Sequence, residues 1–414
     1  MPLRLRDSLS GATRTLAARP GRPLTLYVCG PTVYDVAHVG HARTYLYFDL
    51  VRRYLREQRT PVRHVLNITD FEDKIYVRAT SLHLSWRTLA RREERQFLRD
   101  LSAFGVLPPT ATPRASTFVP EMIRLGRRLA RVGRVERKGD EWTFIPSRSF
   151  ANKNFPIGRE LARHAVPEPS VPLPGEGETA GEFLLWKQQR KPQPSWPSPW
   201  GAGIPGWHME CYAMAEHYLG IPVDIHGGGI DLVYPHHYDE NEISLSLAGQ
   251  PFSRIFLHMG LVRQKGEKMS KSSGNLVPLR GAIEEMGPSA LRWYLLGEPY
   301  QQGLDWNPGD VVRARLEYST VVRRCRSSVE PGTGGSLQLS ELERVVRDIR
   351  HAFENGFEVH RAIDRLKEWN TTIERAGFAR FGRGEIRRAR GLYETLERLI
   401  GIYLITPVGG PRSR

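Results

Sequence analysis

LTLYVCGPTVYDVAHVGHARTYLYFDLVRRYLREQ, residues 24–58, is the stretch that decides the fold. Residues 24–29 alternate and are rich in β-forming side chains, which predicts a strand that Gly30-Pro31 ends. The apolar spacing from about Thr44 predicts a helix, and residues 62–69, VRHVLNIT, predict a second strand. The order strand, helix, strand is typical of the opening of a doubly wound α/β nucleotide-binding domain, whose ligands bind beyond the carboxyl ends of the strands.

The α/β pattern is interrupted in the middle of the chain and resumes afterwards. Between about residues 101 and 182, basic stretches and the Pro-rich PEPSVPLPGEGE replace the alternation, which predicts an inserted subdomain. The later pattern predicts a helix over 209–219 ended by Gly220, a strand near 223–226, a helix after Tyr238 and a strand near 254–261. From about Pro308, apolar helical repeats such as 339–353 and 386–403 predict a helical bundle.

These patterns predict an α/β fold: a doubly wound parallel-sheet nucleotide-binding domain split by an inserted subdomain, followed by a C-terminal α-helical bundle. The predicted division is 1–100 for the first half of the nucleotide-binding domain, 101–182 for the inserted subdomain, 183–262 for its second half with a metal site, 263–307 for a lysine-containing loop and linking helices, and 308–414 for the bundle.

Charge, cysteine number and the lack of long apolar runs indicate which classes of protein are plausible. The 414 residues include 60 Lys+Arg against 45 Asp+Glu, and the net charge of +15 favours a polyanionic partner such as nucleic acid. The 3 cysteines are an odd number, so a disulfide framework is not expected, and metal binding or burial must explain them. No apolar run is long enough to span a bilayer and the first residues lack a signal-peptide pattern, so we expect a cytoplasmic protein without a membrane partner.

Two histidines stand where the first helix should begin. In PTVYDVAHVGH, His38 and His41 are three residues apart and therefore lie on one side of the first turn. Free N–H groups and the helix dipole attract anions there, and two imidazoles add directional donors for a phosphate. Gly40 between them removes a side chain where a planar base could pack. The alternative is a pair of histidines at a solvated helix start.

A second run, KMSKS at residues 268–272, places Lys268 and Lys271 in a small, hydroxyl-rich loop with Gly266 and Gly274 on either side. Such a loop suits a cationic clamp for a triphosphate, although a basic loop can also be a solvated turn. Together and in this order, HVGH and KMSKS resemble the two signatures of the class I aminoacyl-tRNA synthetases. We call residues 38–41 the first signature and residues 268–272 the second.

A third constellation could bind a metal. Cys29 ends the first strand, Cys211 stands in GWHMEC, and His236 and Glu240 stand four apart in YPHHYDENE, so that one helix would present both to one point. Two thiolates, an imidazole and a carboxylate make a plausible zinc shell. The alternative is two buried thiols and an unrelated histidine pair.

Six blocks resemble the cysteinyl-tRNA synthetase family in identity, order and spacing. The blocks are YVCGPTVYDVAHVGH, NITDFEDK, FLLWK, PSWPSPWGAGIPGWHMEC, DIHGGGIDLVYPHH and EKMSKSSGN. The resemblance implies that Cys29, Cys211, His236 and Glu240 hold one zinc ion (Zn2+), which binds the thiolate of the substrate. That would solve a selection problem, because an apolar pocket separates cysteine from serine poorly, whereas zinc prefers a soft thiolate to a hydroxyl.

One departure concerns the fourth ligand. Where the family usually has HHENE, this chain has HHYDENE. Without a gap Glu240 is the ligand, which preserves the spacing of four from His236; two inserted residues would make it Glu242.

The resemblance also implies roles for residues around the reaction. The substrate-binding residues it implies are Cys29, Gly30, Thr69 and Trp207. The ATP-binding residues it implies are His38, Gly40, His41, His226, Gly228, Gly229, Asp231, Lys268, Ser270 and Lys271, of which His38, His41, Lys268 and Lys271 are expected to act in catalysis. Trp207 could instead be an ordinary aromatic residue of the core. The glycines of residues 227–229 could instead form only a tight turn.

The implied activity is ATP-dependent activation of L-cysteine to cysteinyl adenylate and transfer to the 3′ end of tRNA(Cys), with magnesium (Mg2+) accompanying ATP. We expect a monomer whose basic C-terminal helices bind the transfer RNA. Two alternatives stay open. One is a related ligase that joins cysteine to an amino sugar-inositol in mycothiol synthesis. The other is a catalytically inactive paralogue that serves as an RNA-binding or regulatory module.

Overall fold

The computed structural model describes residues 3–17, 21–146, 182–189, 194–269, 274–330, 337–377 and 380–407. Its centre is a parallel sheet of four strands in the order β10-β9-β3-β4. Their bounds are β3 Leu24–Val28, β4 Val62–Leu66, β9 Val223–Gly229 and β10 Ser253–Met259. β3 pairs with β4 on one side and with β9 on the other, so the strand order reverses at β3. In such sheets ligands bind beyond the carboxyl ends of the strands at this point.

Side chains of β3 alternate between two cores, one on each face of the sheet. Leu24, Leu26 and Val28 pack in the core that contains the apolar face of α1, Val39–Glu57. Tyr27 and Cys29 pack in the other core, with α6, His208–Leu219, and α7, Tyr238–Ala248. Because successive side chains of a strand point to opposite faces, both faces are covered, which confirms the predicted doubly wound α/β fold.

Helix α1 begins at Val39, five residues before the start that the apolar spacing predicts. The reason is local: His38 caps the helix, since its side chain accepts a hydrogen bond from the backbone N–H of Gly40. The first turn contains Gly40, His41 and Arg43, which carry no apolar signal. The predicted helix over 209–219 is α6, and Gly220 ends it with φ 74°.

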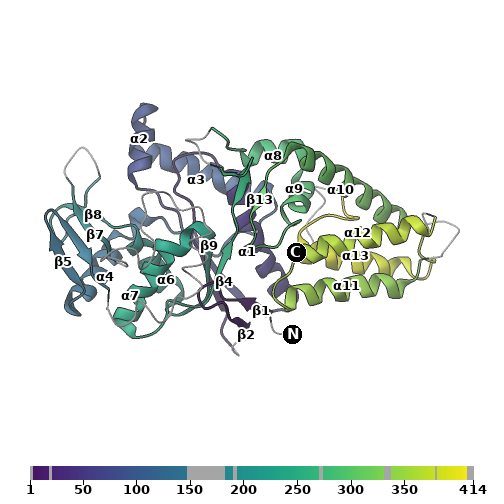
Figure 1. Cartoon of the computed structure of the whole chain (residues 1–414), viewed down its shortest axis with the longest axis horizontal. Coiled ribbons are helices and arrows are strands. Elements are labelled where there is room, and N and C mark those ends of the chain that lie inside the picture. The colour runs from purple at the N-terminus through teal and green to yellow at the C-terminus, as the bar shows by residue number, and fades with distance from the viewer. Residues whose placement is uncertain are drawn as a thin grey trace.

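An antiparallel layer and several helices lie between β4 and α6 in the chain. The antiparallel sheet has the order β5-β6-β7-β8 and lies at the end of the molecule away from the C-terminal helices (Figure 1). The bounds here are α2 Asp73–Ser81, α3 Trp86–Ala103, η1 Ala115–Thr117, α4 Val119–Arg131, β5 Val135–Lys138, β6 Glu141–Phe144, β7 Phe183–Gln188 and β8 Gly203–Pro205. The Pro-rich segment of the predicted insertion lies outside the described residues.

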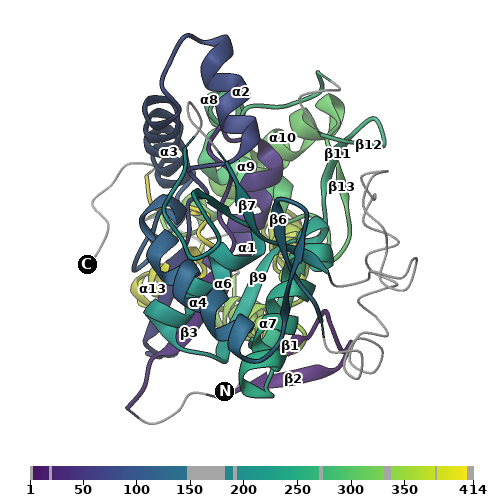
Figure 2. The same ribbon diagram turned by 90° about the vertical axis from the view of Figure 1, so that its left-hand side faces the viewer.

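After β10 the described residues form a small three-stranded sheet and otherwise helices, two of which lie between the strands of that sheet in the chain. The small sheet has the order β12-β11-β13, with β11 Val262–Gln264, β12 Glu267–Lys268 and β13 Leu304–Asp305, and Figure 2 shows its strands side by side at one edge of the molecule. The remaining helices are α8 Leu279–Met286, α9 Pro288–Leu295, α10 Pro308–Ser328, α11 Leu339–Glu354, α12 His360–Arg375 and α13 Ile386–Ile400. Within the described part of the chain no strand follows β13, which confirms the predicted C-terminal helices.

The bundle is anchored on α1. Helix α13 packs against α1, and α10 packs against α9, so the bundle extends from one side of the central sheet (Figure 1). A buried ion pair supports this junction: the Arg292 guanidinium donates from Nη2 to Asp49 Oδ2 at 2.6 Å and to the carbonyl of Ile400 at 3.1 Å. A short hairpin of β1, Leu3–Arg6, and β2, Thr13–Leu16, packs near β10 and α11. None of the described helices combines the length and the apolarity needed to cross a bilayer.

Candidate active site and metal centre

The first signature forms the start of α1. His38 Nδ1 accepts from Gly40 N at 3.1 Å, and His41 Nδ1 accepts from His38 N at 3.4 Å. Since Nδ1 is the acceptor in both rings, each neutral imidazole carries its proton on Nε2 as a donor. The rings stack with 3.9 Å between centroids, and a Cβ at residue 40 would lie 2.8 Å from His38 Cε1. The helix therefore begins with two imidazole N–H donors at the positive end of its dipole, a composition suited to phosphate, while the amides of Val39 and Gly40 are already bonded to Val277 O and His38 Nδ1.

The loops that follow β3 and β4 touch directly. Gly30 N donates to Asn67 Oδ1 at 2.8 Å, Val33 N donates to Thr69 O, and Thr69 N donates to Pro31 O. A Cβ at residue 30 would lie 1.5 Å from Asn67 O, so only glycine fits there. These bonds bring Gly30 and Thr69 to the same end of the sheet.

The second signature follows a hairpin and returns to α1. Lys268 ends β12, where it pairs with Arg263 of β11. The side chain of Lys268, and Ser270 and Lys271 entirely, lie outside the described residues. Beyond the loop, Val277 O accepts from Val39 N at 3.0 Å and Leu279 N donates to Ala37 O at 2.8 Å. The chain just after the second signature is thus bonded to the chain that forms the first.

Four buried ligand atoms meet beyond the carboxyl end of β3. One atom each from Cys29, Cys211, His236 and Glu240 lies within 4.8 Å of the other three. Cys29 follows β3, Cys211 lies in the first turn of α6, His236 lies in the five-residue turn η3, Val233–His237, and Glu240 lies in the first turn of α7. The structure therefore brings together the four residues that the resemblance implies.

The spacing within this group fits a tetrahedral zinc shell. Zinc–sulfur bonds of about 2.3 Å place two thiolates about 3.8 Å apart, and nitrogen and oxygen ligands lie about 3.4 Å apart. The two sulfur atoms of Cys29 and Cys211 are 3.6 Å apart, and His236 Nε2 lies 3.4 Å from Glu240 Oε1. Glu240 Oε1 is buried and accepts no hydrogen bond from the described residues. The types of ligand atom and the distances between them therefore suit zinc.

The electrostatics of the cluster are compatible with a cation that replaces protons. Burial raises the pKa of Cys29 well above its usual value, and neighbouring Cys211 raises it further. Burial likewise raises the pKa of Cys211 and of Glu240. Burial lowers the pKa of His236, which leaves its imidazole neutral and able to ligate. A divalent cation would stabilise two thiolates and a carboxylate that the protein alone holds protonated.

A second group of four atoms shares two members with the first: Cys29, His226, His237 and Glu240. Its internal distances are those of hydrogen bonds, with 2.7 Å between His226 Nε2 and Glu240 Oε2 and 3.3 Å between Cys29 Sγ and His237 Nε2. His237 Nδ1 also lies 2.7 Å from Nε2 of His258, which is outside the group. Hydrogen-bonded histidines that hold a ligand carboxylate or thiol in place are typical of the layer outside a metal shell. The sequence prediction put His226 beside ATP, whereas its buried ring lies between Tyr27 O and Glu240.

Glu242 lies in neither group. Its side chain is buried on α7, and burial raises its pKa to about 7 while Arg134 opposes that shift. The geometry therefore favours Glu240 over Glu242 as the carboxylate of the cluster.

Next to the cluster lie the residues implied for the substrate. The Trp207 ring, 40% exposed, stacks on the His236 ring with 4.2 Å between centroids. Thr69 Oγ1 donates to the buried Glu210 Oε2 at 3.0 Å. Sequence reasoning missed Glu210 and His258. The sequence signal that could have found them is a polar residue within an apolar run. Glu210 stands in WHMEC, and His258 stands in FLHMG.

The glycines at the end of β9 leave room beside Cys29. A Cβ at residue 228 would lie 2.7 Å from Leu232 Cδ1 and 3.6 Å from Cys29 Cβ, and one at residue 229 would lie 2.4 Å from Asp231 Oδ1. Gly228 and Gly229 thus allow the side chains of Leu232 and Asp231 to lie close to the backbone of β9.

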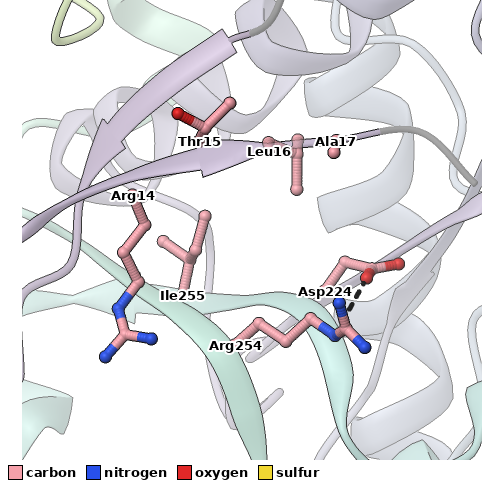
Figure 3. Close-up of a pocket in the computed structure, with 7 residues that line it drawn as sticks. All are labelled: Arg14, Thr15, Leu16, Ala17, Asp224, Arg254 and Ile255. Atoms are coloured by element: carbon pink, nitrogen blue, oxygen red, sulfur yellow. Dashed lines mark ion pairs between the residues drawn. The ribbon is translucent and has the colours of Figure 1, made fainter.

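A pocket lies at the other end of the sheet, between the amino ends of β9 and β10 and strand β2 (Figure 3). Arg254 Nε lies 3.5 Å from Asp224 Oδ1 in its wall, and Arg14 lies on the β2 side. None of the residues that the sequence singles out lines it.

Known proteins resemble the chain over most of its length. Residues 17–315 match the family model described as tRNA synthetases class I (C) catalytic domain. A cysteine--tRNA ligase of Aeropyrum pernix is 38% identical over 361 residues, which are 84% of this chain and 75% of that protein. A cysteine--tRNA ligase of Syntrophotalea carbinolica is 35% identical over 418 residues, 97% of this chain and 84% of that protein. A Mycobacterium tuberculosis methionyl-tRNA synthetase in complex with methionyl-adenylate shares the fold, with TM-score 0.63, 16% identity, and coverage of 91% of this chain and 89% of that one.

Proposed function

The chain belongs to the cysteine--tRNA ligase family of class I aminoacyl-tRNA synthetases, and from that premise we propose that it activates L-cysteine with ATP and esterifies it to tRNA(Cys). The observation that carries the amino-acid assignment is the buried group of Cys29, Cys211, His236 and Glu240 beyond the carboxyl end of β3. The alternative of an amino sugar ligase is not favoured, because the relatives are named as cysteine--tRNA ligases. The alternative of an inactive paralogue is not favoured, because the first signature is intact.

The reaction has two displacements. The cysteine carboxylate attacks the α-phosphorus of ATP and expels pyrophosphate, which gives cysteinyl adenylate. A terminal ribose hydroxyl of the transfer RNA then attacks the acyl carbon and expels AMP, and its proton passes to solvent or phosphate. No enzyme nucleophile takes part, so positioning and charge stabilisation must supply the rate.

The residues of the two signatures would act on ATP. His38 and His41 would donate from Nε2 to phosphate oxygens at the start of α1, a role that their fixed Nδ1 acceptors support. Lys268 and Lys271 would balance the charge that grows on the leaving pyrophosphate, with magnesium on the ATP. Further ATP contacts are proposed for Gly40, Gly228, Gly229, Asp231 and Ser270, whereas the buried ring of His226 would hold Glu240 in place instead.

Selection of cysteine would depend on the metal cluster. Cys29, Cys211, His236 and Glu240 would hold zinc, which when bound lowers the pKa of a thiol and prefers its thiolate to a serine hydroxyl. The exposed Trp207 would cover one side of the bound amino acid, because its ring is fixed by stacking on His236. Gly30 and Thr69, joined across the ends of β3 and β4, would form the adjacent wall.

The remaining proposals concern organisation. We propose the domain division predicted from the sequence, a C-terminal bundle that binds the transfer RNA, a monomer and a cytoplasmic location.

The test compares charging of tRNA(Cys) with cysteine and with serine, together with the zinc content of purified variants. Cys29→Ser and Cys211→Ser should lose zinc and cysteine charging, whereas Cys325→Ser, whose thiol is buried in the bundle beside Tyr393, should keep both. Cysteine charging by a zinc-free wild-type protein would contradict the metal-based selection. Cysteine-dependent pyrophosphate exchange without tRNA charging would favour the amino sugar acceptor instead.

A further inference from the structure

Arg43 is a buried cation whose partners are backbone carbonyls. It lies in α1 two residues after His41 and is fully buried. No carboxylate among the described residues forms an ion pair with it. Its Nη1 donates to Gly260 O at 2.7 Å and to Gln302 O at 2.7 Å, and its Nη2 donates to Pro299 O at 2.9 Å. Burying a guanidinium without a counter-ion is costly, so these bonds indicate a specific use of the side chain.

The three carbonyls belong to the base of the small sheet. Gly260 leads from β10 into β11, and residues 299–302 lead into β13. The two segments are joined to each other, because Gly260 N donates to Tyr300 O at 2.7 Å and a Cβ at residue 260 would lie 2.2 Å from Gln302 O. β11 pairs in parallel with β13, and β12 pairs with β11 on the outer side. Arg43 therefore holds the base of the sheet whose outer strand carries Lys268.

The other side of the second signature is held by the same helix. Val39 N donates to Val277 O and Leu279 N donates to Ala37 O, with an isolated bridge between His38 and Pro278. The segment with the second signature is thus bounded by contacts with α1 on both sides. One rigid helix carries the phosphate-facing histidines and fixes both flanks of that segment.

We propose that Arg43 is a positioning residue for adenylate formation, which holds β11, β12 and β13 on α1 so that Lys268 reaches the phosphates bound at the start of that helix. The proposal rests on the proposed roles of Lys268, His38 and His41. Arg43 touches neither substrate nor metal ligand. Its loss would therefore displace Lys268 from the pyrophosphate leaving group but leave the cysteine pocket intact.

The test measures cysteine-dependent exchange of pyrophosphate into ATP by the zinc-loaded full-length protein. Arg43→Met should lower kcat about 100-fold, since a displacement of about 1 Å costs on the order of that factor. The KM for cysteine and the zinc content should stay at wild-type values. Arg43→Lys should recover part of kcat, because an ammonium can still reach one or two carbonyls. The matched control is Arg52→Met on the same helix, where the guanidinium bonds to Leu107 O and to no other atom of the described residues, and kcat should change less than about threefold.

A double-mutant cycle with Lys268→Ala separates positioning from general destabilisation. If Arg43 acts through Lys268, Arg43→Met should lower kcat far less in the Lys268→Ala background than in the wild type. Equal losses in both backgrounds, or wild-type kcat in Arg43→Met, would overturn the proposal. If Arg43→Met does not fold, the same double-mutant cycle is measured with Arg43→Lys, and the same two outcomes support or overturn the proposal. Failure of the proposed function is distinguishable, because the wild-type protein itself would then show no cysteine-dependent exchange.

Discussion

Zinc binding to the proposed cluster should depend steeply on pH. Burial raises the pKa of Cys29 and of Cys211, so the metal-free protein holds a proton on each thiol at neutral pH. Burial also raises the pKa of Glu240 well above its ordinary value, which adds up to one more proton. Burial lowers the pKa of His236, which has no proton to release. Zinc must displace the protons on the thiols and the carboxylate before it can ligate them.

The magnitude follows from this count. Each displaced proton makes the association constant rise tenfold per pH unit, or about 1.4 kcal/mol. Two to three protons therefore predict a rise of about 100-fold to 1,000-fold per pH unit between pH 6 and pH 8. Zinc affinity should rise, not fall, with pH, because higher pH removes the protons that compete with zinc.

The assay is a competition between the metal-free protein and a zinc-binding dye of known, pH-corrected affinity at pH 6, 7 and 8. Cys29→Ser removes one ionising thiol and should lower the slope by about one proton. Cys325→Ser serves as the control and should leave the slope unchanged, since Cys325 lies in the bundle core. A wild-type slope of one proton or less would refute the reasoning, because it would show that the two buried thiols do not both ionise when zinc binds.

Three further outcomes are expected. Glu240→Gln should lower the zinc content of the purified protein and Glu242→Gln should not, by elemental analysis, because only Glu240 lies in the cluster; equal contents would contradict the choice of ligand. Asp49→Ala should lower the free energy of unfolding by about 3–5 kcal/mol in denaturant titrations, since it leaves Arg292 buried without its carboxylate; a loss below about 1 kcal/mol would show that the pair is dispensable. Burial lowers the pKa of His64, and neither of its ring nitrogens is hydrogen-bonded in the described structure. Below about pH 6.5 the unfolded chain therefore binds a proton that the folded chain does not, and stability should fall by up to about 1.4 kcal/mol per pH unit; His64→Phe should remove that part of the decline, and an unchanged pH dependence would exclude His64 as its source.

Local patterns predicted the parallel sheet and the helices well where one physical signal dominates. Alternation over residues 24–29 predicted β3, and Gly220 marked the end of α6 because the chain there adopts a positive φ. Apolar spacing put the start of α1 five residues too late, whereas the histidine pair marked it correctly, since the first turn is fixed by a histidine cap.

Long-range contacts explain what the sequence could not predict. As an arginine in a helix, Arg43 would be predicted to face solvent. It is buried because it bonds to carbonyl groups 217 to 259 residues later in the chain. Resemblance to a family supplied the cluster of Cys29, Cys211, His236 and Glu240, which spacing alone left open. The hydrogen bond between Thr69 and Glu210 spans 141 residues and carries no pattern that either segment shows by itself.

The wide spacing of the cluster along the chain has a consequence for biosynthesis. Cys29 leaves the ribosome 182 residues before Cys211, and the whole antiparallel layer is translated between them. A nascent chain therefore cannot assemble the four-ligand site until the second half of the central sheet has emerged. Metal acquisition would accordingly wait until Glu240 has emerged, and a chain that stalls within the intervening segment would expose a lone, unligated thiol at Cys29.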